Sequence, residues 1–127
     1  MGAALFPHLL VAIDRRASAH RAAALGVRTA ACIGARVTVL FVVTLPDEAP
    51  PFPDGPGSQS AIDAGERLFR RMRRMANLAG VPCVCRYAFG RDARMIVREA
   101  ATAHHCDLVL VNAPGAAVPA IGATAHG

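Results

Sequence analysis

Two almost uninterrupted apolar runs constrain the fold of this chain more than any other feature of its sequence. They are LLVAI at residues 9–13 and VTVLFVV at residues 37–43. A strand with one face in water alternates apolar and polar residues, whereas an unbroken run indicates a strand that is covered on both faces. Strands of that kind belong to parallel sheets that lie between two layers of helices. The sequence therefore predicts an α/β protein.

The segment after the first run has the spacing of a helix. From about Ala17 to Ile33, small apolar residues recur every three or four positions, which predicts a helix that can pack closely against a sheet. The inward-facing residues would be Ala19, Ala22, Ala23, Gly26, Val27, Ala30 and Ala31. Gly34 is expected to end this helix, because glycine readily takes the left-handed conformation found after helix C-termini.

The alternation continues after the second run. Residues 46–58 contain five prolines and two glycines, which predict a loop within one domain. Ser60 is expected to cap a helix that runs to about Ala79. Residues 81–89 then predict a strand, and Pro82 places this strand at an edge of the sheet because proline cannot donate to a ladder.

A third helix and a fourth strand complete the pattern. Asp92 is expected to cap a helix from Ala93 to about His104, and residues 107–111 (DLVLV) predict the last strand. The order β-α-β-α-β-α-β predicts a doubly wound, mostly parallel open sheet with right-handed crossovers. A chain of 127 residues has the size of one domain, so a single domain over residues 1–127 is predicted.

Composition argues against several classes of protein. No apolar run approaches the ~20 residues that span a bilayer, and the N-terminus lacks the basic leader of a secretory peptide, so a cytoplasmic location is predicted. The net charge is +5, but five Phe, one Tyr and no Trp leave little for bases to stack on, and a nucleic-acid partner is not expected. The few serines have no patterned His and Asp partner, so we predict that the protein is not an enzyme.

One face of the predicted helix at 60–79 permits two interpretations. All 14 basic residues of the chain are arginine, and several gather on the side of this helix that faces away from its apolar residues. They are Arg67, Arg70, Arg71 and Arg74, with Arg73 alongside. This face is either a patch that binds anions or an exposed surface that keeps the protein soluble.

The cysteines also leave alternatives open. Cys83 and Cys85 should face one side of a strand, at a spacing that is typical neither of a redox pair nor of a zinc pair. His104, His105 and Cys106 form either part of a metal site or a pair of histidines near a helix C-terminus, beside a small buried cysteine. No metal is predicted.

A ligand of such a fold would bind where the strand order reverses, outside the carboxyl ends of the strands. The loops that begin at Asp14 and at Asn112 are therefore the candidates. In the second loop, Gly115 and Gly122 would allow a phosphate to approach the backbone closely. The loop contains neither G-x-G-x-x-G nor G-x-x-x-x-G-K-[ST]. It is either a phosphate loop or a turn that contains glycines.

Two long segments resemble a known family. HLLVAIDRRASAHRAAALGVRTAACIGARVTVLFVV resembles the opening of universal stress proteins, and GVPCVCRYAFGRDARMIVREAATAHHCDLVLVNAPG resembles their second half. The resemblance covers roughly residues 8–115. It implies a flavodoxin-like fold, also described as adenine-nucleotide α-hydrolase-like, with strand order 3-2-1-4-5. It also implies a homodimer or another protein partner.

Some members of that family bind ATP, and the resemblance implies which residues would do so here. Asp14 and Val42 match residues that contact the adenine side, and Ala12 stands where many members have proline. The family's phosphate loop is G-x-x-G, then a longer spacer, then G-[ST]. In this chain Asn112 replaces the first glycine, while Gly115 matches the second.

The end of this loop departs further from the family pattern. Gly122 follows after only six residues and precedes Ala123, so Thr124 is the nearest hydroxyl. Asn112 carries a Cβ where the backbone should approach the phosphates closely. Only 12 residues follow Gly115, so the family's fifth strand is predicted to be missing and the strand order becomes 3-2-1-4.

These departures lead to a functional prediction. We expect a regulatory protein of the general stress response that acts by association with a partner and binds ATP weakly or not at all. The alternative is an ATP-binding member of the family, with or without Mg²⁺, whose phosphate loop is relaxed. No cofactor is certain.

Overall fold

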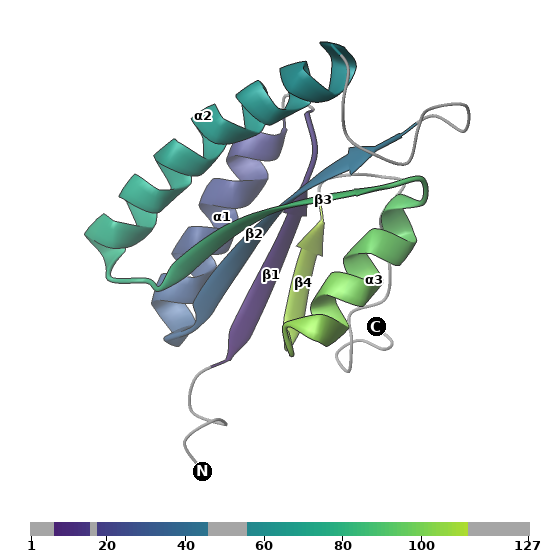
Figure 1. Ribbon diagram of the computed structural model, residues 1–127. Coiled ribbons are helices and arrows are strands. Elements are labelled where there is room, and N and C mark those ends of the chain that lie inside the picture. The colour runs from purple at the N-terminus through teal and green to yellow at the C-terminus, as the bar shows by residue number, and fades with distance from the viewer. Residues whose placement is uncertain (1–6, 16–17, 46–55, 112–127) are drawn as a thin grey trace.

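The computed structural model describes residues 7–15, 18–45 and 56–111, and strands alternate with helices throughout this part of the chain (Figure 1). The elements are β1 (His8–Ile13), α1 (Ala19–Ile33), β2 (Arg36–Thr44), α2 (Pro56–Ala79), β3 (Cys83–Gly90), α3 (Ala93–Ala103) and β4 (Leu108–Val111). The predicted β-α-β-α-β-α-β order is confirmed, with most boundaries within two residues of the expected positions.

The strands form one parallel sheet in the order β3-β2-β1-β4. The predicted order 3-2-1-4 is thus confirmed for the described residues, and β3, which follows Pro82, lies at an edge as predicted. β1 pairs with β2 and with β4, so the first apolar run occupies the interior of the sheet. Residues 112–127, where a fifth strand was predicted to be missing, lie outside the described residues.

Helices cover both faces of the sheet, which confirms the doubly wound architecture. α1 and α2 lie on one face, and α3 lies on the other (Figure 1). Side chains of β1 alternate between the two layers: Leu9, Val11 and Ile13 join the core under α1 and α2, while Leu10 and Ala12 join the core under α3. The period of two along a strand thus accounts for an unbroken apolar sequence.

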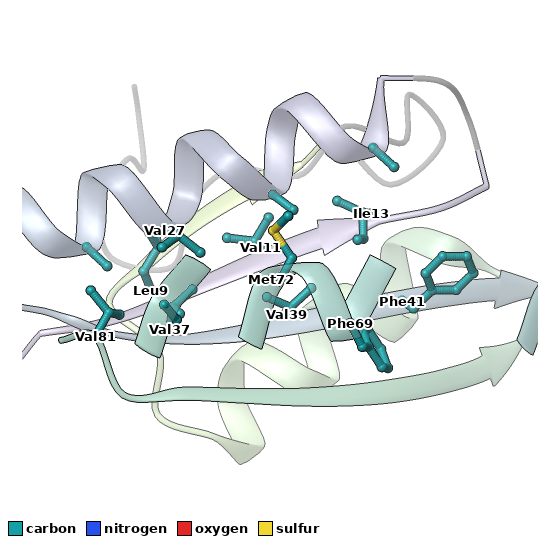
Figure 2. Close-up of a cluster of buried hydrophobic side chains, with 14 of the residues drawn as sticks. Leu9, Val11, Ile13, Val27, Val37, Val39, Phe41, Phe69, Met72 and Val81 are labelled. Atoms are coloured by element: carbon teal, nitrogen blue, oxygen red, sulfur yellow. The ribbon is translucent and has the colours of Figure 1, made fainter. Parts of the chain in front are cut away.

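The larger core lies under α1 and α2, and Figure 2 shows its central residues. Val27 of α1 and Phe69 and Met72 of α2 pack on side chains from β1 and β2. The rings of Phe41 and Phe69 meet edge to face with centroids 6.2 Å apart. Tyr87 of β3 extends this aromatic group, with its ring centroid 4.9 Å from that of Phe69. Such contacts add to the burial of apolar area and fix α2 over the edge of the sheet.

α1 approaches β1 closely at Gly26. A Cβ atom placed on Gly26 would overlap Cγ2 of Val11, so the helix can lie this close to the strand only because the residue has no side chain. The small-residue stripe of α1 was predicted to permit such packing, and its members are buried or half-buried apart from Ala31. The prediction for Ala31 is wrong, because this residue is exposed. Ala24, which was not predicted to face inward, is buried, so the buried face of the helix is rotated slightly from the predicted one.

Local signals explain where the helices end and begin. Gly34 follows α1 with a φ of 68°, and its N–H donates to the Ala30 carbonyl, as expected for a helix C-terminus. Asp92 caps α3 as predicted, with its carboxylate accepting from the N–H groups of Arg94 (3.0 Å) and Met95 (3.4 Å).

The predicted start of α2 at Ser60 is wrong, and so is the prediction of a loop as far as residue 58. The helix begins at Pro56, four residues earlier. Proline is well suited to the first position of a helix, where its missing N–H would have no partner in any case. The sequence prediction treated this proline as a breaker and therefore shortened the helix. Residues 46–55 of the predicted loop lie outside the described residues.

Replacing Gly26 by alanine tests the close approach of α1 to β1. Glycine to alanine in a helix ordinarily stabilises a protein by about 0.5–1 kcal/mol. Here we expect the reverse, a loss of about 1–3 kcal/mol in the free energy of unfolding, because the new methyl group overlaps Val11. Chemical denaturation measures the change. Val11→Ala removes the overlapping methyl group, so Gly26→Ala should lower the free energy of unfolding less in the Val11→Ala background than in the parent protein. If the effects of the two substitutions on this free energy were simply additive, the contact would be refuted.

Candidate functional site

The carboxyl ends of β1, β2 and β4 meet at one edge of the sheet. β1 ends at Ile13, which lies opposite Phe41, whereas β2 continues to Thr44. On the other side of β1, Val111 of β4 lies opposite Ala12. Asp14 therefore follows β1 into the space between the ends of two neighbouring strands, and its side chain is half-buried. The structure thus places Asp14 where the sequence predicted a ligand.

β2 extends past the end of β1 beside Asp14. Residues 42–44 still pair with β3, but they have no partner in β1. Backbone N–H and C=O groups of a strand point alternately to its two sides, so some of those in residues 42–44 face the side of Asp14. These groups could bind the edge of a flat heterocycle in the same way that a neighbouring strand would.

The side chains of Ala12 and Val42 are not open to this edge. Ala12 is 0% exposed and Val42 is 3% exposed, and both pack in the core under α3. Both residues were predicted as part of a nucleotide site, and the structure places them near the carboxyl edge of the sheet, where that site was predicted. Their side chains are core residues, so any contact with a ligand there would come from the backbone.

The other predicted site residues follow β4 in the sequence. Asn112 comes directly after Val111, the residue that pairs with Ala12. Asn112, Gly115, Gly122 and Thr124 themselves lie outside the described residues. Their predicted role in a phosphate loop stays a prediction.

Comparison with known families agrees with this arrangement. Residues 6–125 match the model of the family described as "Universal stress protein family", which is nearly the whole chain. The chain belongs to the universal stress protein family. The match includes β1, the Asp14 edge and the predicted loop after β4, so the resemblance of the two quoted segments is confirmed.

Solved structures of universal stress proteins share the fold. One from Burkholderia pseudomallei is 22% identical with a TM-score of 0.70, and the match covers 84% of this chain and 81% of that one. UspA from Lactobacillus plantarum is 18% identical with a TM-score of 0.67, covering 86% of this chain and 81% of that one. A universal stress protein solved in complex with cAMP is 18% identical with a TM-score of 0.57, covering 83% and 70%. A search of curated proteins finds no significant match.

The opposite edge of the sheet holds a polar cluster that joins β1, β2 and the turn before β4, in which His8 and Thr38 are buried and Asp107 is exposed. His8 donates its backbone N–H to Asp107 Oδ2 at 2.8 Å, and the Asp107 N–H donates to the His8 carbonyl at 2.7 Å. Nδ1 of His8 lies 2.8 Å from the His104 carbonyl, and Nε2 lies 2.7 Å from Thr38 Oγ1. Because a carbonyl can only accept, Nδ1 carries the hydrogen, and the Thr38 hydroxyl donates to Nε2 of the neutral ring.

Burial is the main reason that the pKa of His8 is lowered from 6.5. The His104 carbonyl opposes this effect, since it accepts from the ring, while the charge of Arg36 adds to it. A neutral His8 fits the pattern of its hydrogen bonds, in which Nε2 must accept. We call His8, Thr38 and Asp107 the amino-edge cluster.

The sequence prediction missed the amino-edge cluster. Each member was visible as a polar residue at or near the amino end of an apolar strand: His8 before LLVAI, Thr38 within VTVLFVV, and Asp107 before LVLV. Three such residues at the same end of parallel strands lie close together once the strand order is known. That order, and not any single spacing, was the missing information.

The cysteines and histidines do not gather into a metal centre within the residues that the structure describes. Cys106 is buried, which raises the pKa of its thiol to about 11, and His105 is exposed. Cys83 and Cys85 face the same side of β3, as predicted, and a hydrogen bond from Cys85 lowers the pKa of Cys83. In the described part of the chain, no helix combines the length and hydropathy needed to cross a membrane.

Truncating Val42 tests whether its side chain belongs to the core. Val42→Ala should lower the free energy of unfolding by about 2 kcal/mol because it leaves a small cavity under α3. Val84 offers a matched control, since it is also a strand valine on the α3 side of the sheet but is 46% exposed. Val84→Ala should cost less than about 0.5 kcal/mol. Equal costs for the two variants would show that Val42 is not core.

The amino-edge cluster makes stability depend on pH through His8. The folded protein binds this proton less readily than the unfolded chain does, so the stabilisation is present above about pH 6.5 and decreases as the pH falls below it. Urea unfolding between about pH 8 and about pH 5.5 should show this loss, and His8→Asn should reduce it. The control is His105→Asn, an exposed site with a φ of 53°, where asparagine is well tolerated. An unchanged pH dependence in His8→Asn would refute the assignment.

Proposed function

We propose that this universal stress protein is a regulatory protein of the general stress response that acts by association and binds ATP weakly or not at all. The observation that carries the proposal is the contrast between two strand ends. After β1, Asp14 and the end of β2, which has no partner in β1, keep the backbone that would receive a base. After β4, the sequence supplies Asn112 where the family loop has glycine.

The physical reason lies in how a triphosphate is bound. Phosphate loops bring backbone N–H groups against the oxygens, which requires residues without a side chain at the points of closest approach. Asn112 carries a side chain at the first such point, and Ala123 lacks the hydroxyl that follows the last glycine in the family pattern. The base side of the site is thus retained, whereas the triphosphate has lost part of its binding surface.

Association is the second part of the proposal. β4 is short, and within the described residues β1 is its only neighbour in the sheet. Edge strands carry backbone groups that can pair with another chain, and Leu108 on this strand is partly exposed. We propose a homodimer or another protein partner, a cytoplasmic location and no catalytic activity.

The alternative is nucleotide binding through a relaxed site. It is favoured by one solved structure of the same fold, a universal stress protein in complex with cAMP. A cyclic nucleotide carries a single phosphate, so it depends less than ATP does on a complete phosphate loop. If this chain binds a nucleotide, the side of residues 42–44 that has no partner in β1 would receive the base.

Thermal unfolding with and without nucleotide separates these possibilities. A ligand at about 100-fold excess over its Kd stabilises a protein by about 2.7 kcal/mol. We expect no clear rise in Tm for the full chain with millimolar ATP and Mg²⁺, and we expect Asn112→Gly combined with Ala123→Ser to create one. Sedimentation of the same samples gives the oligomeric state.

Two outcomes would overturn the proposal. A large rise in Tm for the parent protein with ATP, abolished by Asp14→Asn, would establish the nucleotide-binding alternative. A monomer at all concentrations, with no partner recovered, would remove association. The matched control is Asn77→Gly, an exposed asparagine on α2, which should create no ATP response.

A further inference from the structure

Four arginines of α2 line an open hollow on the outer surface of the α1 and α2 layer. The hollow has a volume of about 240 Å³ and is lined by Arg67, Arg70, Arg71 and Arg74. These positions are spaced i, i+3, i+4 and i+7, so they lie on one face of the helix and span about 10 Å along it. We call this set the arginine row.

The carboxylates that should pair with the arginine row are engaged elsewhere. Asp63 and Glu66 precede Arg67 and Arg70 by four residues, the spacing at which helical ion pairs form. Asp63, however, accepts a hydrogen bond from Gln59 at 3.0 Å. Glu66 accepts one from the Tyr87 hydroxyl at 2.7 Å, which draws it toward β3 and away from the row.

No carboxylate of the described residues forms an ion pair with any member of the row. Like charges at these spacings repel one another and destabilise a helix. A bound anion would therefore reduce the repulsion between the arginines and stabilise α2. Arg71 is also positioned by α1, since its Nη1 lies 3.2 Å from Nε2 of His20. The row is therefore available to a ligand and partly held in place.

We propose that the arginine row binds an anion with two or more adjacent phosphates. Guanidinium groups match phosphate oxygens through paired hydrogen bonds, and four of them in a row suit several phosphates rather than one. The hollow is smaller than the roughly 300–1,000 Å³ pockets that hold drug-sized molecules. Arg73, which packs over the ring of Phe69 at 5.8 Å, does not line the hollow, and among the described residues that line it there is no aromatic ring to stack on a base.

This site is distinct from the candidate nucleotide edge. The row lies in the middle and second half of α2, whereas Asp14 directly follows β1 at the carboxyl edge of the sheet. Figure 1 shows α2 in the helical layer and β1 in the sheet beneath it. The phosphates could belong to a free chain of phosphates or to a phosphorylated lipid head group. Both sources share the chemistry, and the experiment must distinguish them.

Inorganic tripolyphosphate is the probe, because it carries adjacent phosphates but no base that could bind beside Asp14. Calorimetric titration of the full chain should show binding that weakens as salt is raised. Arg70→Gln with Arg74→Gln should weaken it about tenfold or more, since two charge-assisted contacts are lost. The matched control is Arg94→Gln with Arg98→Gln, which removes the same charge at the same spacing from exposed positions on α3. Asp14→Asn should leave this binding unchanged.

The outcomes decide the proposal and the source of the phosphates. Equal loss in the two double variants would reduce the effect to net charge and overturn the site, as would absence of binding to both tripolyphosphate and vesicles. If the parent protein binds vesicles that contain phosphatidylinositol bisphosphate but does not bind tripolyphosphate, the site is supported and its ligand is a lipid head group. A single-stranded oligonucleotide that binds more tightly than either, with the same arginine dependence, would overturn the proposal in favour of a nucleic acid.

Discussion

The described fold depends on one constraint, which is that its two central strands have no face in water. β1 buries alternate side chains under α1 and α2 on one side and under α3 on the other. Strands covered on both faces are typical of parallel sheets, in which each connection between neighbouring strands is a crossover that usually contains a helix. The helices are therefore a consequence of the strands, and Gly26 marks the point where this requirement is most demanding, because the helix backbone lies directly on Val11.

Parallel strands give the two edges of the sheet different chemistry. The carboxyl edge has strands of unequal length, so that β2 extends past β1 beside Asp14 and its last backbone groups have no partner in β1. The amino edge is closed by reciprocal hydrogen bonds between His8 and Asp107 and by the ring of His8 on Thr38. Ligands of such sheets bind outside the carboxyl ends of the strands. The hydrogen bonds at the amino ends instead contribute to stability.

The sequence predicted the strands, their burial and the position of Asp14, because these depend on periodicity and on the order of elements. It failed where the outcome depends on which residues meet in space. The start of α2 was misplaced since proline both ends and begins helices, and the sequence does not say which. The assignment of Val42 to a ligand by resemblance stays a prediction, and because its side chain is buried under α3, a contact there would have to come from its backbone. The contact of Glu66 with Tyr87, 21 residues apart, has no local signal at all, and the loop residues from Asn112 to Thr124 stay predictions.

The amino-edge cluster also has a consequence for the kinetics of the fold. It joins residues 99 positions apart, so closing it costs more loop entropy than a local contact does, and we expect it to form late in folding. Contacts that form late in folding are absent from the transition state, and they slow unfolding without speeding folding. We therefore expect the contacts of His8 to lower the unfolding rate of the native protein while leaving its folding rate nearly unchanged.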